Sequence, residues 1–393
     1  MVTRKATRAA QGSGTIRQRS NGQWEARYTL GRDPGTGKQI QRSIYGKTQT
    51  DVLKKLRQIQ SSIDDNTYNE PTRMTVSNWL DVWQAEYLSD IKPGTRYTYG
   101  LQVNVHIVPA LGAIQLQKLQ PHAIQTFCND LSRLKGLSPK TIKNVHGVLH
   151  AALEKAVFLG YIKNNPAAKT ALPRLERPQL TILPEEQLPA FVEALSDDIY
   201  GSIMYIALFT GMRQGEVMGL TWDCVDFESG TILVRHQLIR YGSSKAYSLA
   251  PLKNDKPRLL APAPSIMQEL REVRKQQMEY KLRAGAAWNN HLNLVFTNEI
   301  GTHLSKTTVY NHFKRIAANI GIPGLRFHDL RHSFAVNSLQ SGDDVKTVQE
   351  ALGHHTAAFT LDVYGFVTDK MRRDSGARME QFIQQNGARK RCS

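Results

Sequence analysis

The stretch His328-Asp-Leu-Arg331-His332 decides how the second half of this chain is interpreted. His328 and Arg331 are three residues apart, and this spacing puts both side chains on one face of a helix, within reach of one ligand. Asp329 stands near the start of that predicted helix and is a candidate cap. His332 lies one step round the helix, and we interpret it as a buried structural histidine.

Three more short motifs frame this stretch, one before it and two after it. An apolar helix and a glycine precede the first motif, so its arginine is expected to emerge from a rigid base. The second motif ends an amphipathic segment, which places its imidazole at a helix terminus. The motifs are Thr210-Gly-Met-Arg213-Gln-Gly-Glu216, Leu352-Gly-His354-His355 and Leu361-Asp-Val-Tyr364.

Together these motifs supply the groups that phosphoryl transfer needs. Arg213 and Arg331 can bind a phosphate bidentately and are permanently charged, which a lysine cannot match. His328 and His354 can complete a ring of donors around the phosphate, whose oxygens gain charge during the reaction. Tyr364 follows them and can attack. The set therefore indicates the breaking and rejoining of a phosphodiester without metal or ATP.

A zinc site is the alternative for part of this pattern, because His328 and His332 are spaced like two ligands on one helix face. No glutamate lies between them and no pattern for a third ligand stands out. No nucleotide-binding loop is found either. We therefore expect no metal and no cofactor.

The charge of the chain favours a polyanionic partner. Lysine and arginine number 51 against 34 acidic residues, a net charge of +17. A merely basic protein would share this balance, but the charge is concentrated: thirteen basic residues precede Ile59, against only Glu25, Asp33 and Asp51. No apolar run approaches the roughly 20 residues of a membrane span. The absence of a signal segment and of a cysteine framework predicts a cytoplasmic protein.

The first seventy residues are expected to form a small basic module. Residues 1–12 are predicted as a disordered arm. Strands are expected at 14–19, 23–30 and 39–45, with a hairpin signal at Asn21-Gly22, and a helix at 48–63. Trp24 and Tyr28 would form a core or a stacking face. The candidate DNA contacts on this sheet are Arg17, Arg19, Arg27 and Arg42.

Residues 71–178 are predicted to be all helical. Thr75 is a plausible cap of the first helix. The helix expected at 138–159 begins with Ser138 as its cap and a proline at its first position. Lys140 and Lys143 flank its positive end, which is either a phosphate site or a pair of solvated lysines.

A mixed pattern follows in residues 179–393. Helices are expected at 185–195, 199–210 and 214–220, strands at 231–240, 246–251 and 258–261, and helices again from 265. The fold class is therefore α+β and multidomain. It comprises a three-stranded sheet plus helix (1–70), an all-helical domain (71–178) and a mainly helical domain with a small antiparallel sheet (179–393).

The ordered set Thr-Gly-x-Arg213, His328-x-x-Arg331, Leu-Gly-His354 and Tyr364 resembles the tyrosine recombinases, the phage-integrase family. The motifs cover about residues 180–370, and the helical domain before them also fits. The N-terminal module looks like the arm-site-binding domain of phage and conjugative-transposon integrases.

The resemblance implies a role for each matching residue. Tyr364 would be the nucleophile that forms a 3′-phosphotyrosyl link with DNA. Arg213 and Arg331 would clamp the scissile phosphate, and His328 and His354 would assist by hydrogen bonding and proton transfer.

The family also has a lysine on a β-hairpin that protonates the leaving 5′-oxygen. The segment Leu252-Lys253-Asn-Asp-Lys256-Pro-Arg258 offers two. Lys253 is preferred because it begins the turn, and Lys256 would then be a phosphate contact. Glu216 matches the family's acidic residue after the first arginine and is expected to be structural.

The expected function is site-specific DNA recombination that integrates and excises a mobile element. The helical and catalytic domains would clamp core DNA, the N-terminal module would bind arm sites, and four copies would form the synaptic tetramer, with DNA-bending accessory proteins as further candidate partners. The tail, 365–393, would dock on a neighbouring protomer or pack on its own domain. The alternatives are a type IB topoisomerase, a non-catalytic sequence-specific DNA-binding protein and a metal-dependent nuclease.

Overall fold

The computed structural model describes residues 15–33, 35–64, 73–175, 181–240, 247–252, 256–353, 356 and 369–386. The arm predicted at residues 1–12 lies outside them. The chain divides into two compact units, residues 1–176 and 177–393. Helices predominate and the sheets are small and antiparallel, as the sequence predicts.

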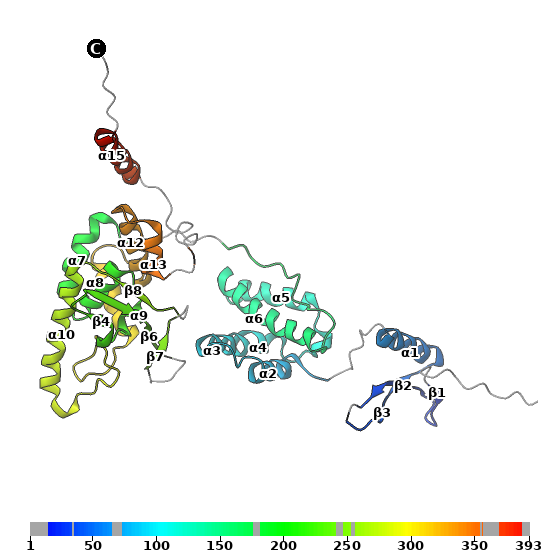
Figure 1. The fold of residues 1–393 in the computed structure, drawn as a ribbon. Coiled ribbons are helices and arrows are strands. Elements are labelled where there is room, and N and C mark those ends of the chain that lie inside the picture. Colours follow the sequence, from blue (N-terminus) through cyan, green and yellow to red (C-terminus); the bar gives the residue numbers. More distant parts are fainter. Residues whose placement is uncertain are drawn as a thin grey trace, which may run out of the picture. The chain divides into compact units, whose positions relative to one another are not determined.

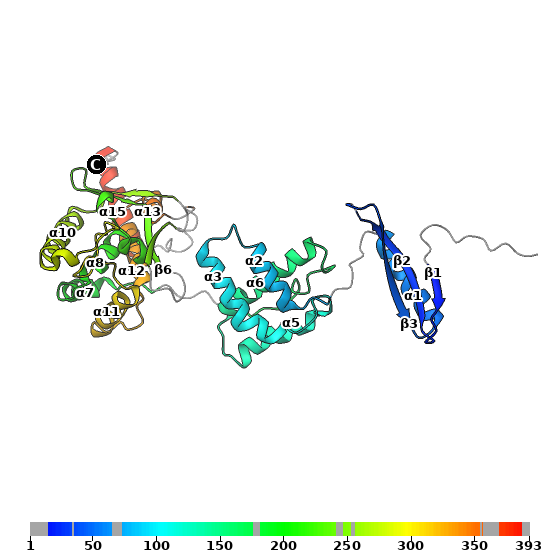
Figure 2. The ribbon, with the colours of Figure 1, turned by 90° about the horizontal axis from the view of Figure 1, so that it is seen from below.

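The first unit begins with a three-stranded antiparallel sheet in the order β1-β2-β3. Helix α1 packs on one face of this sheet (Figures 1 and 2), around a core that includes Ala26, Tyr28, Val52 and Leu56. Tyr28 therefore belongs to the core rather than to a stacking face. The elements are β1 (Thr15–Gln18), β2 (Trp24–Arg32), β3 (Gln39–Gly46) and α1 (Gln49–Asp64).

The remainder of the first unit is helical. Thr75 Oγ1 accepts from the N–H of Asn78 and Ser138 Oγ from that of Thr141, which confirms both predicted caps. Trp79 is fully buried, and its Nε1 donates to the Ala152 carbonyl at 2.9 Å, joining the first helix to the last. The elements are α2 (Val76–Glu86), α3 (Pro93–Gln102), a π-helical stretch (Val103–Ile107), α4 (Val108–Leu111), a 3-10 turn (Leu116–Lys118), α5 (Pro121–Arg133) and α6 (Pro139–Phe158).

The second unit is built around α8, whose apolar residues are buried on all sides. This helix packs against α7, α9, α10 and α12 (Figure 1), so the residues that follow its C-terminus start from a fixed position. The helices are α7 (Leu188–Ser196), α8 (Gly201–Thr210), α9 (Gln214–Met218), α10 (Pro264–Ala284), α11 (Lys306–Asn319), α12 (Phe327–Gln340), α13 (Val345–Leu352) and α15 (Asp369–Asn386), with 3-10 turns at Glu185–Gln187, Trp222–Cys224 and Gly285–Ala287.

Two small sheets complete this unit. One has the order β4-β5-β8, with strands Val225–Asp226, Thr231–Val234 and Arg258–Leu260, and the other pairs β6 (His236–Arg240) with β7 (Tyr247–Pro251). The expected single strand at 231–240 is wrong, because its two halves bind different partners and separate at Arg235. Alternation of apolar residues continues across that point and carries no information about the pairing partner.

No helix in the described ranges has both the length and the apolar character needed to cross a membrane.

Candidate active site

Arg213 lies just beyond the C-terminus of α8, at the start of α9. Helix α8 ends at Gly211, whose φ of 66° is left-handed. A Cβ atom at Gly211 would lie 2.5 Å from a ring carbon of Phe334 and 2.8 Å from a methyl of Leu352. Only glycine therefore fits this turn, and the close approach of α12 and α13 fixes the base from which Arg213 extends.

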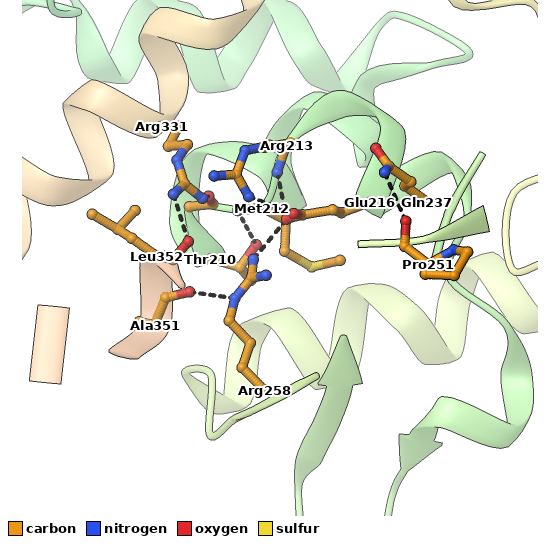
Figure 3. A network of polar contacts seen from close by, with 11 residues as sticks. Thr210, Met212, Arg213, Glu216, Gln237, Pro251, Arg258, Arg331, Ala351 and Leu352 are labelled. Carbon is orange, nitrogen blue, oxygen red and sulfur yellow. Dashed lines mark hydrogen bonds and ion pairs between the residues drawn. The ribbon is translucent and has the colours of Figure 1, made fainter. Parts of the chain in front are cut away.

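Glu216 holds Arg213 in place (Figure 3). Its side chain is 2% exposed. The carboxylate accepts from the Arg213 N–H at 3.0 Å and from Arg213 Nη1 at 2.7 Å, and it also accepts from Arg258 Nη2 at 2.6 Å. Burial opposes ionisation, but the charges and hydrogen bonds of Arg258 and Arg213 lower the pKa of Glu216 to about 2. The expected structural role of Glu216 agrees with this arrangement.

Arg331 projects from α12 and is 2% exposed. Its Nη1 donates to the carbonyl oxygen of Gly211 at 2.7 Å, and its Nη2 donates to that of Leu352 (Figure 3). Both acceptors are carbonyls at helix C-termini, where the helix dipole favours a cation. Arg331 therefore joins the end of α8 to the end of α13.

His328 lies on the same helix, and its ring meets that of His332 edge to face with centroids 5.0 Å apart. Loss of surrounding water, followed by the positive charge of His332, Arg331 and Arg213, lowers the pKa of His328 to about 4. His328 is therefore neutral near pH 7, although its side chain still reaches solvent. His332 is half-buried, and burial lowers its pKa as well.

Asp329 caps α12 as the sequence predicts. It is fully buried and accepts from the backbone N–H of Arg326 at 2.7 Å and from the Arg326 guanidinium. Within the described part of the chain, no group of three or more His, Cys, Asp and Glu side chains is placed to hold a metal ion.

Three predicted catalytic residues are described, and the structure brings them together. Arg331 binds Gly211, two residues before Arg213, and the charges of both arginines reach His328. Lys253, His354 and Tyr364 lie outside the described residues. Helix α13 ends as predicted at Leu352, with a left-handed Gly353 (φ 64°) immediately before His354.

The arginines proposed for the N-terminal module lie on two faces of its sheet. Arg17 and Arg27 approach the Glu25 carboxylate at 2.7 and 3.2 Å and Arg19 at 3.6 Å, with all three side chains about half exposed. Arg42 pairs in register with the buried Tyr28 and so belongs to the other face, where it is exposed.

The lysine candidates are accessible to different degrees. Lys140 is exposed and Lys143 is half-buried in the first two turns of α6. Lys256 is exposed, two residues before β8 begins.

Sequence reasoning missed one member of the site. Arg258 begins β8, its side chain is 9% exposed, and it binds both Glu216 and the Ala351 carbonyl. The available signal was an arginine leading directly into the apolar pair Leu259-Leu260, where a charged side chain needs a partner.

Comparison with known proteins identifies the family. The family model described as "Phage integrase family" matches residues 181–371, and that described as "Phage integrase, N-terminal SAM-like domain" matches residues 75–132. The chain belongs to the phage integrase family of tyrosine recombinases. It is a site-specific DNA recombinase of the kind encoded by mobile elements.

Relatives of this tyrosine recombinase match it over most of their length. A "Tyrosine recombinase XerC-like" protein of Caldanaerobacter subterraneus is 28% identical, covering 88% of this chain and 93% of the relative. The "ICEBs1 integrase" of Bacillus subtilis is 22% identical, covering 94% and 100%.

Solved structures of integrases share the fold of this tyrosine recombinase. The Tn1549 transposon integrase, in complex with a circular intermediate DNA, has a TM-score of 0.66 at 22% identity, covering 78% of this chain and 99% of that one. A lambda integrase tetramer bound to a Holliday junction has a TM-score of 0.54 at 19% identity, covering 90% and 96%.

Proposed function

We propose that this tyrosine recombinase cuts and rejoins DNA through Tyr364. The phenolic oxygen attacks the scissile phosphorus, a bond from tyrosine to the 3′-phosphate forms, and the bond to the 5′-oxygen breaks. The phenol loses its proton and the departing 5′-oxygen gains one. Attack by a 5′-hydroxyl on the phosphotyrosine reverses these changes and joins the strands, so the energy of the bond is kept and no nucleotide is consumed.

Arg213 and Arg331 are proposed to bind the phosphate as its equatorial oxygens gain charge. Glu216 receives two guanidiniums with one carboxylate, so the group of three keeps a net positive charge for the phosphate. His328 is neutral in the free protein and can donate one hydrogen bond without adding charge. His354 is proposed to act beside it.

A lysine on the segment between β7 and β8 is proposed to protonate the 5′-oxygen. Lys253 is preferred, and Lys256 is proposed as a phosphate contact. A lysine suits this role because its proton is transferable, whereas an arginine holds its proton too firmly.

The observation that carries this proposal is the hydrogen bond between Arg331 and Gly211. Through it, the helix that bears His328 and Arg331 is fixed to the turn that bears Arg213. Two guanidiniums and a neutral imidazole thus converge from segments far apart in the sequence, an arrangement that suits a phosphodiester.

Trapping of a covalent adduct tests the proposal. With a nicked suicide substrate of the element's core site, the wild-type protein should form an adduct that resists denaturation, in EDTA as well as in buffer. Tyr364→Phe should bind the same DNA and form none, whereas Tyr310→Phe, a matched change on α11, should form it normally. An adduct with Tyr364→Phe, or a requirement for a divalent metal, would contradict the mechanism.

The three parts of the chain are proposed to divide the work on DNA. Residues 1–70 would bind arm sites, residues 71–178 core sites, and residues 179–393 would cut. The exposed Arg17, Arg19 and Arg27 support the first assignment, and Lys140 at the start of α6 the second. The setting would be the cytoplasm of a bacterial cell, with DNA-bending proteins as candidate accessory partners.

A homotetramer is proposed as the active assembly, with the tail of one copy docked on the next. Helix α15 (Asp369–Asn386) supports this because it presents apolar side chains at its surface. Three of its apolar side chains, Met379, Phe382 and Ile383, are 60%, 61% and 44% exposed. Deletion of residues 368–393 should abolish tetramers on DNA, measured by light scattering; unchanged tetramers would overturn the docking role.

A further inference from the structure

Arg258 occupies a central place in the network of Figure 3. It donates from Nη2 to Glu216 Oε2 at 2.6 Å and from Nε to the Ala351 carbonyl at 2.7 Å. One planar side chain thus makes two charge-assisted bonds to two different segments. A lysine at this position has a single nitrogen, which cannot reproduce both bonds.

Each of its partners leads to a residue of the proposed site. Glu216 holds the backbone and the guanidinium of Arg213. Ala351 lies in the last turn of α13, two residues before Gly353, and His354 follows Gly353. The aliphatic part of Arg258 also packs there, since a Cβ at Gly353 would lie 3.2 Å from Arg258 Cδ.

The charges of Arg213, Glu216 and Arg258 together favour the binding of a phosphate. If Glu216 had Arg213 as its sole partner, the two charges would cancel at the place where a phosphate must bind. Arg258 supplies the second positive charge and leaves a net charge of +1 on the group. Burial of Glu216 and Arg258 makes this compensation stronger than it would be in water.

We propose that Arg258 is a positioning residue for strand cleavage: through Glu216 it sets Arg213, and through Ala351 it sets the end of α13 that leads into His354. This inference rests on the proposed function. In the sequence, Arg258 follows Lys256 by two residues and Lys253 by five.

The test compares Arg258→Lys and Arg258→Met with matched changes at Arg235, which lies in the same unit and forms an ion pair with Asp223 rather than with Glu216. DNA affinity and the single-turnover cleavage rate at saturating DNA are measured on the suicide substrate. Arg258→Lys should reduce the rate about 10- to 100-fold, as expected for a small misplacement of reacting groups, with DNA affinity within about threefold of wild type. Arg258→Met should be slower still, and both Arg235 variants should match wild type.

A second substrate separates positioning from overall damage. A 5′-bridging phosphorothiolate has a sulfur leaving group that departs without needing a proton. Arg258→Lys should remain slow on it, because Arg213 is still misplaced relative to the scissile phosphate. If the cleavage rate of Arg258→Lys on this substrate returned to that of the wild type, Arg258 would act only through the proposed proton donor Lys253. That result would overturn the roles of Glu216 and α13.

The outcomes separate this inference from the function it rests on. A wild-type rate in folded Arg258→Lys and Arg258→Met would overturn the positioning role and leave the proposed function intact. A rate that falls only in proportion to the unfolded fraction, measured by thermal melting, would reduce Arg258 to a structural residue. Absence of a Tyr364 adduct in the wild-type protein would overturn both.

Discussion

Arg331 donates a hydrogen bond of 2.7 Å from Nη1 to the carbonyl oxygen of Gly211, which lies 120 residues earlier in the chain. The same guanidinium binds the Leu352 carbonyl. The arginine proposed to bind the phosphate is therefore also a link between three helices, and its substitution should affect stability as well as cleavage.

Arg331→Lys should lower the free energy of unfolding of the second unit, residues 177–393, by about 2–4 kcal/mol, because at least one buried carbonyl loses its donor. Urea unfolding followed by circular dichroism measures this. Arg235→Lys, at a partly exposed ion pair, should change stability by less than about 1 kcal/mol. Equal stability of the two variants would contradict the linking role of Arg331.

Gly211→Ala should be strongly destabilising, by about 3 kcal/mol or more, because it combines a left-handed backbone with a clash against Phe334 and Leu352. Gly230→Ala is the matched control, since Gly230 has a φ of 67° and a Cβ atom added there would meet nothing within 4 Å. It should cost only about 1 kcal/mol. Thermal melting of both proteins compares them, and similar losses would argue against the tight approach of α12 and α13.

Glu216→Gln should reduce stability at pH 7 by about 3–5 kcal/mol, because it leaves Arg258 buried without its charge partner. The pKa of Glu216 is about 2 in the folded protein against 4.5 ordinarily. Its contribution is therefore complete above about pH 4.5 and is lost as the pH falls toward 2.

Denaturant unfolding of the wild type and of Glu216→Gln between pH 7 and pH 3 checks this pH dependence. The difference between the two proteins should be constant down to about pH 5 and should then shrink. If the difference in the free energy of unfolding stayed constant down to pH 3, the negative charge of Glu216 would not be the source of the stabilisation.

His328 should titrate near pH 4 in the free protein, followed by NMR of its ring protons. Its ordinary pKa is 6.5, so between pH 6.5 and pH 4 the unfolded chain takes up a proton that the folded chain does not, and stability falls as the pH falls through this window. Arg213→Gln should raise the pKa of His328 by removing a positive charge, whereas Arg235→Gln should not. An unchanged midpoint in Arg213→Gln would contradict the closeness of the two side chains.

Glu25→Gln should tighten binding of the protein to DNA at low salt several-fold, because Arg17, Arg19 and Arg27 would no longer share a carboxylate. The slope of log affinity against log salt should steepen by up to about 1. Asp33→Asn is the control, since it removes one charge from a carboxylate that caps its own turn through Gly35 and Thr36. Equal effects of the two changes would show that the DNA affinity depends on the total charge of the protein and not on the three arginines around Glu25.

Local signals in the sequence were sufficient wherever one segment determines its own structure. Thr75 and Ser138 cap helices as predicted, because a cap bonds to a backbone group three residues away. The spacing of His328 and Arg331 likewise predicted one helix with both side chains on it.

Contacts between residues distant in the sequence could not be predicted from these local signals. The split of residues 231–240 into β5 and β6 depends on which strand each half meets. Arg258 shows the same limit, because its acceptor on Ala351 lies 93 residues later and is a backbone atom, which every residue possesses.

The contact between Arg258 and Ala351, 93 residues later in the chain, also determines when the network around Arg258 can form during protein synthesis. Synthesis proceeds from the N-terminus, so the helices of residues 76–158 leave the ribosome long before Ala351 exists. Until then Arg258 lacks its second acceptor and Arg331 lacks Leu352. The growing chain therefore carries the helices proposed to bind core DNA before it can assemble the arginine network proposed for cleavage, and that network must wait for residues 351 and 352.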